Sequence, residues 1–62
     1  MPLVHINMFK GRTMDQRREM VKEVTNSIVK TLKCDKEAVR IVVNEIEKDD
    51  VSVGGVLYSE KD

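Results

Sequence analysis

The sequence predicts an α+β fold, in which a parallel β-α-β unit is followed by a short C-terminal β-hairpin. Two runs rich in β-forming residues, at 3–9 and 39–46, flank one long run with helical periodicity. Two strands joined by a helix are expected to be parallel, with a right-handed crossover. Gly54-Gly55 interrupts the apolar segment that follows, which is typical of a tight hairpin. The chain has 62 residues, so we expect a single domain over residues 1–62.

The first predicted strand, residues 3–9, alternates between two faces. One face is purely apolar and is expected to pack on the helix; it consists of Val4, Ile6 and Met8. The opposite face is mixed, which suits a site or a partner subunit; it consists of Leu3, His5, Asn7 and Phe9. His5 is the only histidine, and we interpret it as a polar residue of the strand face rather than a catalytic group.

The predicted helix begins at Thr13 and runs to about Lys33. Thr13 and Gln16 have the spacing of a capping box, and Asp15 in the first turn favours the helix dipole. One apolar stripe recurs at steps of three and four residues; it consists of Met20, Val21, Val24, Ile28 and Leu32. The charged residues off this stripe are expected on a solvated face; they include Arg17, Arg18, Lys22, Glu23 and Lys30.

The segment after the helix is predicted to be a short turn with Asp35 as a possible cap, followed by the second strand at 39–46. That strand is nearly continuous in its apolar middle, and Arg40 is the exception. A guanidinium on such a strand needs a carboxylate or an opening to solvent. Two interpretations of Arg40 stay open here, a salt bridge at the strand end and an arginine that binds an anion. Residues 51–58 are predicted to form the hairpin, and 59–62 a loose tail.

Composition excludes several functional classes. Eleven basic and eleven acidic residues give no net charge, which argues against a nucleic-acid partner. No apolar run is long enough for a membrane span, and no secretory signal pattern is present. One His and one Cys do not suffice for a zinc site, so we expect no metal, and we expect no cofactor. The single Cys34 cannot form a disulfide within the chain, which fits a reducing, cytoplasmic location. A chain this short, without a disulfide or a metal site to stabilise it, is expected to oligomerise. A second subunit would then cover the free face of the sheet.

Pro2, directly after Met1, is the candidate chemical group. Removal of Met1, giving a mature chain of residues 2–62, leaves a secondary amine that acts as a base when neutral. An α-amino group titrates at about 7.7–8.0, and a secondary amine is intrinsically more basic. Burial or a nearby positive charge lowers this pKa. The strand that follows is expected to hold this amine at the lip of the sheet. The harmless alternative is an ordinary N-terminus, because proline is common at this position.

The sequence resembles the 4-oxalocrotonate tautomerase family along nearly its whole length. The shared pattern consists of Pro2, Gly11-Arg12 after the first strand, Asp15-Gln16 at the start of the long helix, the arginine in V-R-I-V-V, and Gly54-Gly55. The resemblance implies a β-α-β fold with a terminal hairpin, assembled as a hexamer from a trimer of dimers. It also implies an isomerase of aromatic hydrocarbon catabolism, acting on a dienol acid such as 2-hydroxymuconate.

The resemblance implies a role for each candidate residue. Pro2 is expected to shuttle a proton between the enol oxygen and a carbon of the dienol. Arg12 is expected to hold the distal carboxylate, and Arg40 the 2-oxygen and near carboxylate, with both arginines supplied by neighbouring subunits. The residues expected to line the pocket are Leu3, Phe9, Val51 and Val53. Positive charge where the enolate oxygen develops is what such a proton transfer requires.

Val51 departs from the family pattern, which commonly has an aromatic residue there. The smaller side chain implies a wider or wetter pocket, for which Phe9 or Tyr58 are candidate compensators. The departure keeps two alternatives to a homohexameric enzyme: a heterohexamer in which a related chain supplies the ring, and a weak or inactive binding module. Hydratase or dehalogenase chemistry is a third alternative, although no acidic residue stands out to activate water.

Overall fold

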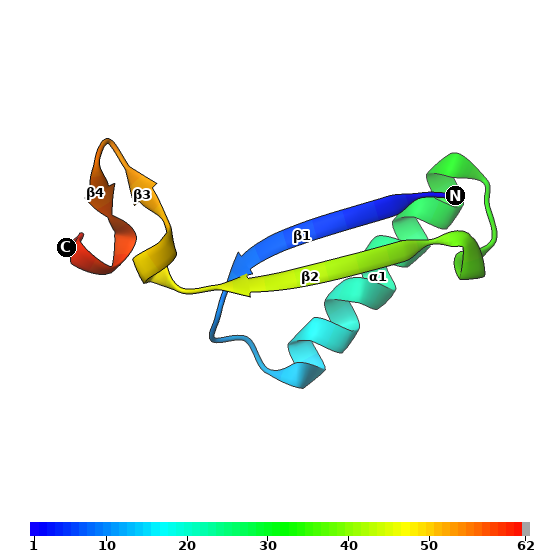
Figure 1. Ribbon diagram of the computed structural model, residues 1–62. Helices are drawn as coiled ribbons and strands as arrows, with labels where there is room; N and C mark the ends of the chain where they lie inside the picture. The colour runs from blue at the N-terminus through cyan, green and yellow to red at the C-terminus, as the bar shows by residue number, and fades with distance from the viewer. Residues whose placement is uncertain (62) are drawn as a thin grey trace.

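The computed structural model describes residues 1–61, and its elements follow the predicted order. Strand β1 (Leu3–Phe9) is followed by helix α1 (Met14–Leu32) and then by strand β2 (Arg40–Ile46). β1 and β2 pair in parallel in one two-stranded sheet. The hairpin consists of the antiparallel strands β3 (Ser52–Val53) and β4 (Val56–Leu57). The predicted β-α-β unit with a terminal hairpin is therefore confirmed (Figure 1).

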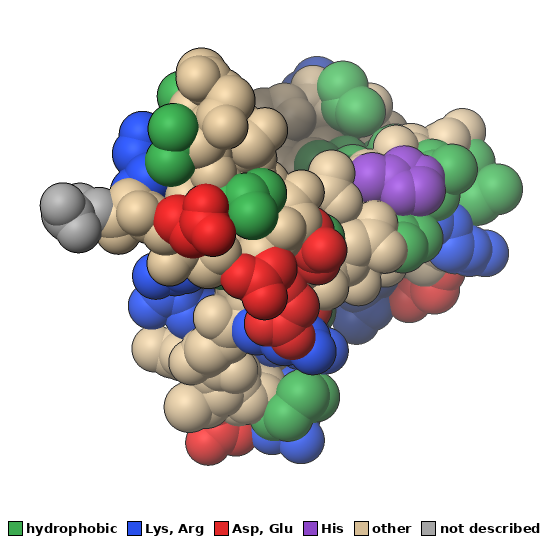
Figure 2. Space-filling model, turned by 60° about the vertical axis from the view of Figure 1, so that its left-hand side comes forward, with side chains coloured by type: hydrophobic (Ala, Val, Ile, Leu, Met, Phe, Trp, Pro, Cys, Tyr) green, Lys and Arg blue, Asp and Glu red, His purple; other side chains and the backbone are tan. Residues whose placement is uncertain are grey.

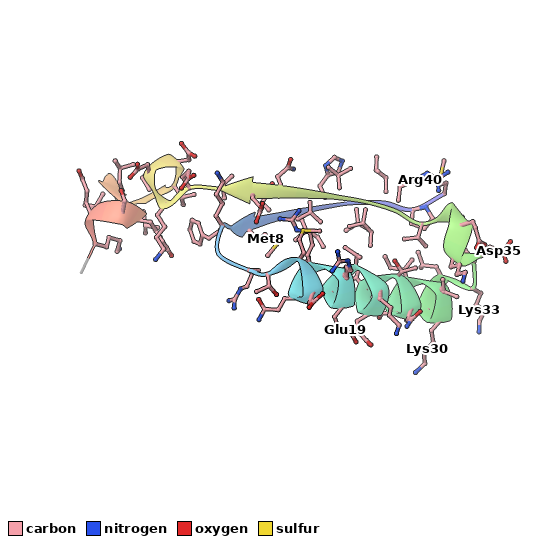
Figure 3. The ribbon with its side chains drawn as sticks, turned by 90° about the horizontal axis from the view of Figure 1, so that it is seen from below. Met8, Glu19, Lys30, Lys33, Asp35 and Arg40 are labelled. Atoms are coloured by element: carbon pink, nitrogen blue, oxygen red, sulfur yellow. The ribbon has the colours of Figure 1, made fainter. Side chains whose placement is uncertain are left out.

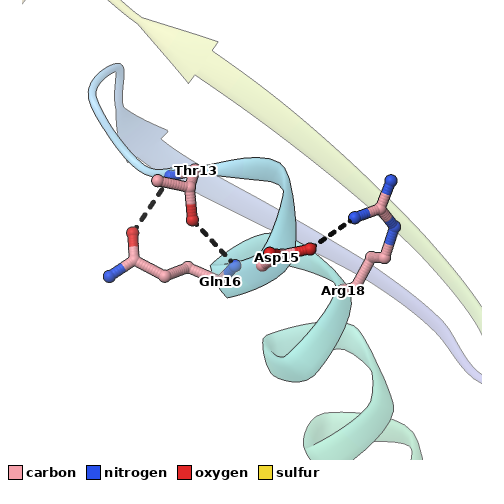
Figure 4. Close-up of polar contacts among 4 residues, drawn as sticks. All are labelled: Thr13, Asp15, Gln16 and Arg18. Carbon is pink, nitrogen blue, oxygen red and sulfur yellow. Dashed lines mark hydrogen bonds and ion pairs between the residues drawn. The ribbon is translucent and has the colours of Figure 1, made fainter.

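The start of α1 is fixed by the capping box that the sequence predicts. The Gln16 backbone N–H donates to Thr13 Oγ1 at 3.1 Å, and the Thr13 N–H donates to Gln16 Oε1 at 3.0 Å (Figure 4). These two bonds satisfy donors that the first helical turn otherwise leaves free. The helix ends at Lys33, whose φ of 55° is left-handed and whose N–H donates to the Val29 carbonyl oxygen.

The helix covers one face of the β1–β2 sheet and leaves the other face open. Val4, Ile6 and Met8 are half-buried, and Met8 points between the sheet and α1 (Figure 3). On the opposite face, Leu3 is 62% exposed and Val42 is 41% exposed. Figure 2 shows the histidine side chain of this face among exposed hydrophobic side chains. The predicted division of β1 into a covered and an uncovered face is confirmed.

Four local predictions were wrong. Arg17 is not on the solvated face: it continues the apolar stripe one turn before Val21, is partly covered, and pairs with Glu45. Leu32, the last residue of α1, is 63% exposed. Asp35 occupies the cap position of the 3-10 turn Lys36–Ala38, but its side chain makes no capping hydrogen bond.

The fourth correction concerns the C-terminus. The segment 59–62 is not simply a loose tail, because Tyr58–Glu60 forms a 3-10 turn closed by the Lys61 N–H and the Tyr58 carbonyl oxygen at 3.3 Å. Asp62, part of the same prediction, lies outside the described residues. Tyr58, the first residue of this turn, packs its ring against Phe9 at the end of β1.

The chain is flat and elongated, and residues 1–61 contain no fully buried side chain. Its extents are 43 × 24 × 14 Å, and its radius of gyration is 14.9 Å. A compact domain of this length has a radius of gyration of about 11 Å. None of the helices in residues 1–61 has the length and apolar character that crossing a membrane requires. The hydrophobic layer between α1 and the sheet is therefore only half of a globular core.

Candidate active site

Pro2 and Arg40 lie together at the edge where both parallel strands begin. The backbone N–H of Arg40 donates a hydrogen bond to the Pro2 carbonyl oxygen at 3.0 Å. Leu3 is the register partner of Arg40, so three of the predicted site residues share this edge. Pro2 is half-buried here. Strand pairing alone therefore fixes the candidate base beside the backbone of the candidate cation.

The Arg40 guanidinium is exposed at this edge, at the end of the sheet in Figure 3. Its Nη1 donates to the backbone carbonyl oxygen of Glu37, in the 3-10 turn that precedes β2. Among residues 1–61 it forms no ion pair, so the strand-end salt bridge is not found. A guanidinium has five N–H donors in a planar fork that matches a carboxylate. Most of these donors remain available to an anion.

Arg12 lies at the opposite edge, where β1 ends. Gly11 has a φ of 126°, a conformation that favours glycine, and it turns the chain from β1 toward α1. The Arg12 side chain is exposed and lines two pockets, of about 250 Å³ and about 420 Å³. Within residues 1–61 it has no carboxylate partner. Arg12 is thus a second cation that is open to an anionic ligand.

The aromatic and valine candidates also lie away from Pro2. The Phe9 and Tyr58 rings have centroids 5.2 Å apart and planes tilted by 32°. The Tyr58 N–H donates to the Val51 carbonyl oxygen at 2.8 Å, so the hairpin region carries Val51 beside this aromatic pair. Val51 is half-buried, whereas Val53 is 51% exposed. Phe9 and Tyr58, the rings expected to compensate for the missing aromatic residue, therefore lie near Val51.

One chain does not unite the predicted site. Pro2, Leu3 and Arg40 lie at one end of β1, and Phe9 and Arg12 at the other. A strand rises by about 3.3 Å per residue, so the length of β1 separates the two groups by roughly 20 Å. Figure 1 shows the hairpin at the end opposite the N-terminus. A small substrate that touches both groups must therefore sit between copies of the chain.

The sequence analysis missed an ion pair beside Arg12. Lys10 Nζ lies 2.8 Å from Glu47 Oε1, and the hydrogen bond and charge of Glu47 raise the pKa of Lys10. The register could have revealed this pair, because Lys10 and Glu47 follow the partners Phe9 and Ile46 at the strand ends. Residues 1–61 contain no cluster of three side chains suited to holding a metal ion.

The chain is similar to tautomerases over almost its entire length. The profile of the family described as "Tautomerase enzyme" matches residues 2–61. A probable tautomerase of Listeria monocytogenes is 43% identical over 60 residues, covering 97% of this chain and 98% of that protein. A probable tautomerase of Staphylococcus epidermidis is 38% identical over 61 residues, covering 98% of this chain and all of the relative.

Solved structures with the same fold agree with these relatives. YwhB, a homologue of 4-oxalocrotonate tautomerase, superposes with a TM-score of 0.94 at 31% identity, covering 98% of this chain and 100% of that one. A heterohexamer 4-oxalocrotonate tautomerase from Chloroflexus aurantiacus superposes with a TM-score of 0.89 at 25% identity, and 97% of each chain is covered.

Proposed function

Because the chain belongs to the tautomerase family, we propose that it is an isomerase that converts a dienol acid such as 2-hydroxymuconate into its conjugated 2-oxo form. The observation that carries the proposal is the backbone hydrogen bond between Arg40 and Pro2, which holds the candidate base beside a strand residue whose guanidinium forms no ion pair within residues 1–61. We also propose that the protein is cytoplasmic and that it acts in aromatic hydrocarbon catabolism.

Pro2 is the proposed general base. Its nitrogen takes the proton of the 2-hydroxyl group and returns it to a carbon of the conjugated chain, so no external acid is consumed. This role requires removal of Met1, because a proline nitrogen acylated by a preceding residue is an amide without basicity. The half-buried position of Pro2 and the positive charge of Arg40 both favour the neutral amine.

The two arginines have different proposed tasks. Arg40 binds the 2-oxygen and the near carboxylate, where negative charge develops during proton transfer, so it acts on the reaction itself. Arg12 holds the distal carboxylate and orients the substrate. Leu3, Phe9, Val51 and Val53 form the proposed apolar lining. The resemblance implies that neighbouring subunits supply both arginines. Because β1 separates Arg12 from Pro2 within one chain, we propose this for Arg12, as in a homohexamer. The Arg40 beside Pro2 belongs to the same chain.

A heterohexamer with a weak or inactive role for this chain is the second candidate. Val51 favours it, because a valine leaves the proposed pocket wetter than an aromatic ring would, and a related chain can supply that ring. The heterohexameric relative from Chloroflexus aurantiacus gives this arrangement a precedent within the same fold. Hydratase or dehalogenase activity has less support, because that chemistry needs an acidic residue to activate water and the sequence offers no clear candidate.

The deciding experiment is a spectrophotometric assay of the purified chain with 2-hydroxymuconate and with phenylenolpyruvate. Mass spectrometry of the same sample establishes whether Met1 is present. We expect activity in protein that begins at Pro2 and none in protein that retains Met1. Absence of activity in protein shown to begin at Pro2 would contradict the enzymatic proposal and favour the mixed assembly. In that case, adding a second chain from the same cell should restore activity.

A further inference from the structure

A cationic pocket lies where the chain leaves both parallel strands. Its volume is about 420 Å³, and its walls come from the end of β1, the Gly11 turn and the 3-10 turn that follows β2. The lining residues are Met8, Phe9, Lys10, Gly11, Arg12 and Lys48. Three of these carry positive charge and none carries negative charge. The pocket is therefore suited to an anion.

The charges of this lining are not equivalent. Lys10 is neutralised by Glu47 at 2.8 Å. Arg12 and Lys48 form no ion pair within residues 1–61. Of the acids near Lys48 in sequence, Asp50 accepts a hydrogen bond from the Glu47 backbone N–H at 3.3 Å, and Asp49 shares a second pocket with Lys48 but forms no ion pair with it within residues 1–61. Lys48 therefore stands beside Arg12 as a second cation that an incoming anion can neutralise.

Backbone hydrogen bonds fix the two turns that carry these cations. The Lys10 N–H donates to the Ile46 carbonyl oxygen at 3.1 Å, which extends the strand pairing into the turns. The Asp50 N–H donates to the Glu47 carbonyl oxygen at 2.9 Å and closes the turn that carries Lys48. Turns that are already formed lose less backbone freedom on ligand binding than flexible loops do.

The pocket also has apolar walls. Met8 and Phe9 are half-buried, and the Phe9 ring packs on Tyr58. A carbon chain that ends in a carboxylate matches this combination, with methylenes against Met8 and Phe9 and oxygens toward the cations. A monoacid with its carboxylate at Arg40 would present only carbon here and leave both cations solvated.

We propose that Lys48 is a specificity-determining residue, which together with Arg12 binds the far carboxylate of a dicarboxylate substrate. This inference rests on the proposed function, because it assigns the second carboxylate of the same substrate. Arg12 contributes a planar fork and Lys48 a point charge, so the pair neutralises one carboxylate from two loops. Lys48 does not touch the reacting carbons and acts through substrate affinity.

Substitution of Lys48 tests the proposal by comparing two substrates. We expect Lys48→Gln to raise KM for 2-hydroxymuconate by about tenfold, the loss of one charge-assisted contact. KM for phenylenolpyruvate and kcat for both substrates should change by less than about twofold, because no charged partner is lost. Lys48→Arg should retain most of the affinity. Lys30→Gln is the matched control, since Lys30 points away from the sheet in Figure 3.

A binding measurement separates this inference from the proposed function. In ¹H–¹⁵N spectra, adipate should shift the amide signals of Lys10–Arg12 and Lys48 and bind more tightly than hexanoate, with the difference lost in Lys48→Gln. Equal KM changes for the diacid and the monoacid, or no change for the diacid, would overturn the role of Lys48 while leaving the isomerase intact. If neither substrate turns over, the proposed function fails, and adipate binding no tighter than hexanoate would overturn the cation pair separately.

Discussion

Val42→Asp should dissociate the assembly. Val42 lies in the middle of the uncovered sheet face, opposite His5 in the register, and is 41% exposed. The carboxylate would enter a face whose other β2 positions are Arg40 at one end, the neutral Asn44 and the apolar Ile46. In a closed assembly every copy carries the substitution, so the penalty is repeated at each equivalent contact.

The accessible surface of the chain sets the scale of this effect. It is 5055 Å² for 7.1 kDa, whereas a compact monomer of this mass exposes about 4100 Å². The excess of about 950 Å² per chain is close to one partner's share of a standard interface, about 800 Å². Losing the burial of Val42 costs about 1 kcal/mol. Burying an unpaired carboxylate costs several more, so about 4 kcal/mol per chain is expected.

Sedimentation velocity at micromolar concentration, with far-ultraviolet circular dichroism, measures the outcome. A loss of about 4 kcal/mol from a single chain already raises a dissociation constant by about a thousandfold, and the equivalent contacts add to it. The separated chain should also lose helix, because residues 1–61 have no fully buried side chain to hold it together. Val42→Thr keeps the shape and should remain largely assembled. Asn26→Asp adds the same charge on the exposed side of α1 and should sediment as the unmodified protein does.

Two results would refute this reasoning. One is an unmodified protein that is folded and sediments near 7 kDa at micromolar concentration, because the uncovered face then needs no partner. The other is a Val42→Asp protein that sediments with the unmodified assembly, which would show that the partner covers a different surface.

Four further predictions concern the proposed site and the helix. Arg12→Ala should raise KM for 2-hydroxymuconate but not for phenylenolpyruvate, whereas Arg40→Ala should also lower kcat, each contact contributing about 2–4 kcal/mol in steady-state assays. In protein that begins at Pro2, kcat/KM should rise with pH to a plateau as the amine loses its proton, with a midpoint near neutrality. Full activity after acylation of the Pro2 nitrogen would refute its role as the base. Val51→Phe should move this midpoint to lower pH by drying the amine. Thr13→Ala should lower the free energy of unfolding by about 1 kcal/mol in denaturant titrations, through loss of the cap.

Local patterns predicted the fold well because the relevant physics is local. The capping box at Thr13 needs only side chains within one helical turn, and the alternation of β1 needs only its own residues. The strand–helix–strand order then leaves little choice of topology. Arg17 was misplaced because its environment depends on Glu45, a residue of β2 that meets it only after the helix packs on the sheet.

The site was predictable only in part. The closeness of Pro2 and Arg40 follows from register, which the apolar patterns of both strands constrain. The position of Lys48 relative to Arg12 depends on how two turns leave the sheet, and no periodicity encodes that. The grouping of Arg12 with Pro2 rests on family resemblance, since a single chain holds them apart and only contacts between copies can join them.

The open sheet face imposes opposing requirements on assembly and chemistry. Val42 and Leu3 favour being covered, yet Arg40 shares their face and has no carboxylate partner within residues 1–61. A partner that buried the whole face would bury this charge, at a cost that exceeds the gain from the valine. The favourable arrangement covers the middle of the sheet and stops short of its Arg40 edge. A cation at the rim of such an interface is partly desolvated, which strengthens its attraction for a substrate anion. We therefore expect that an assembly of this kind would create its site for an acidic substrate at the rim beside Pro2.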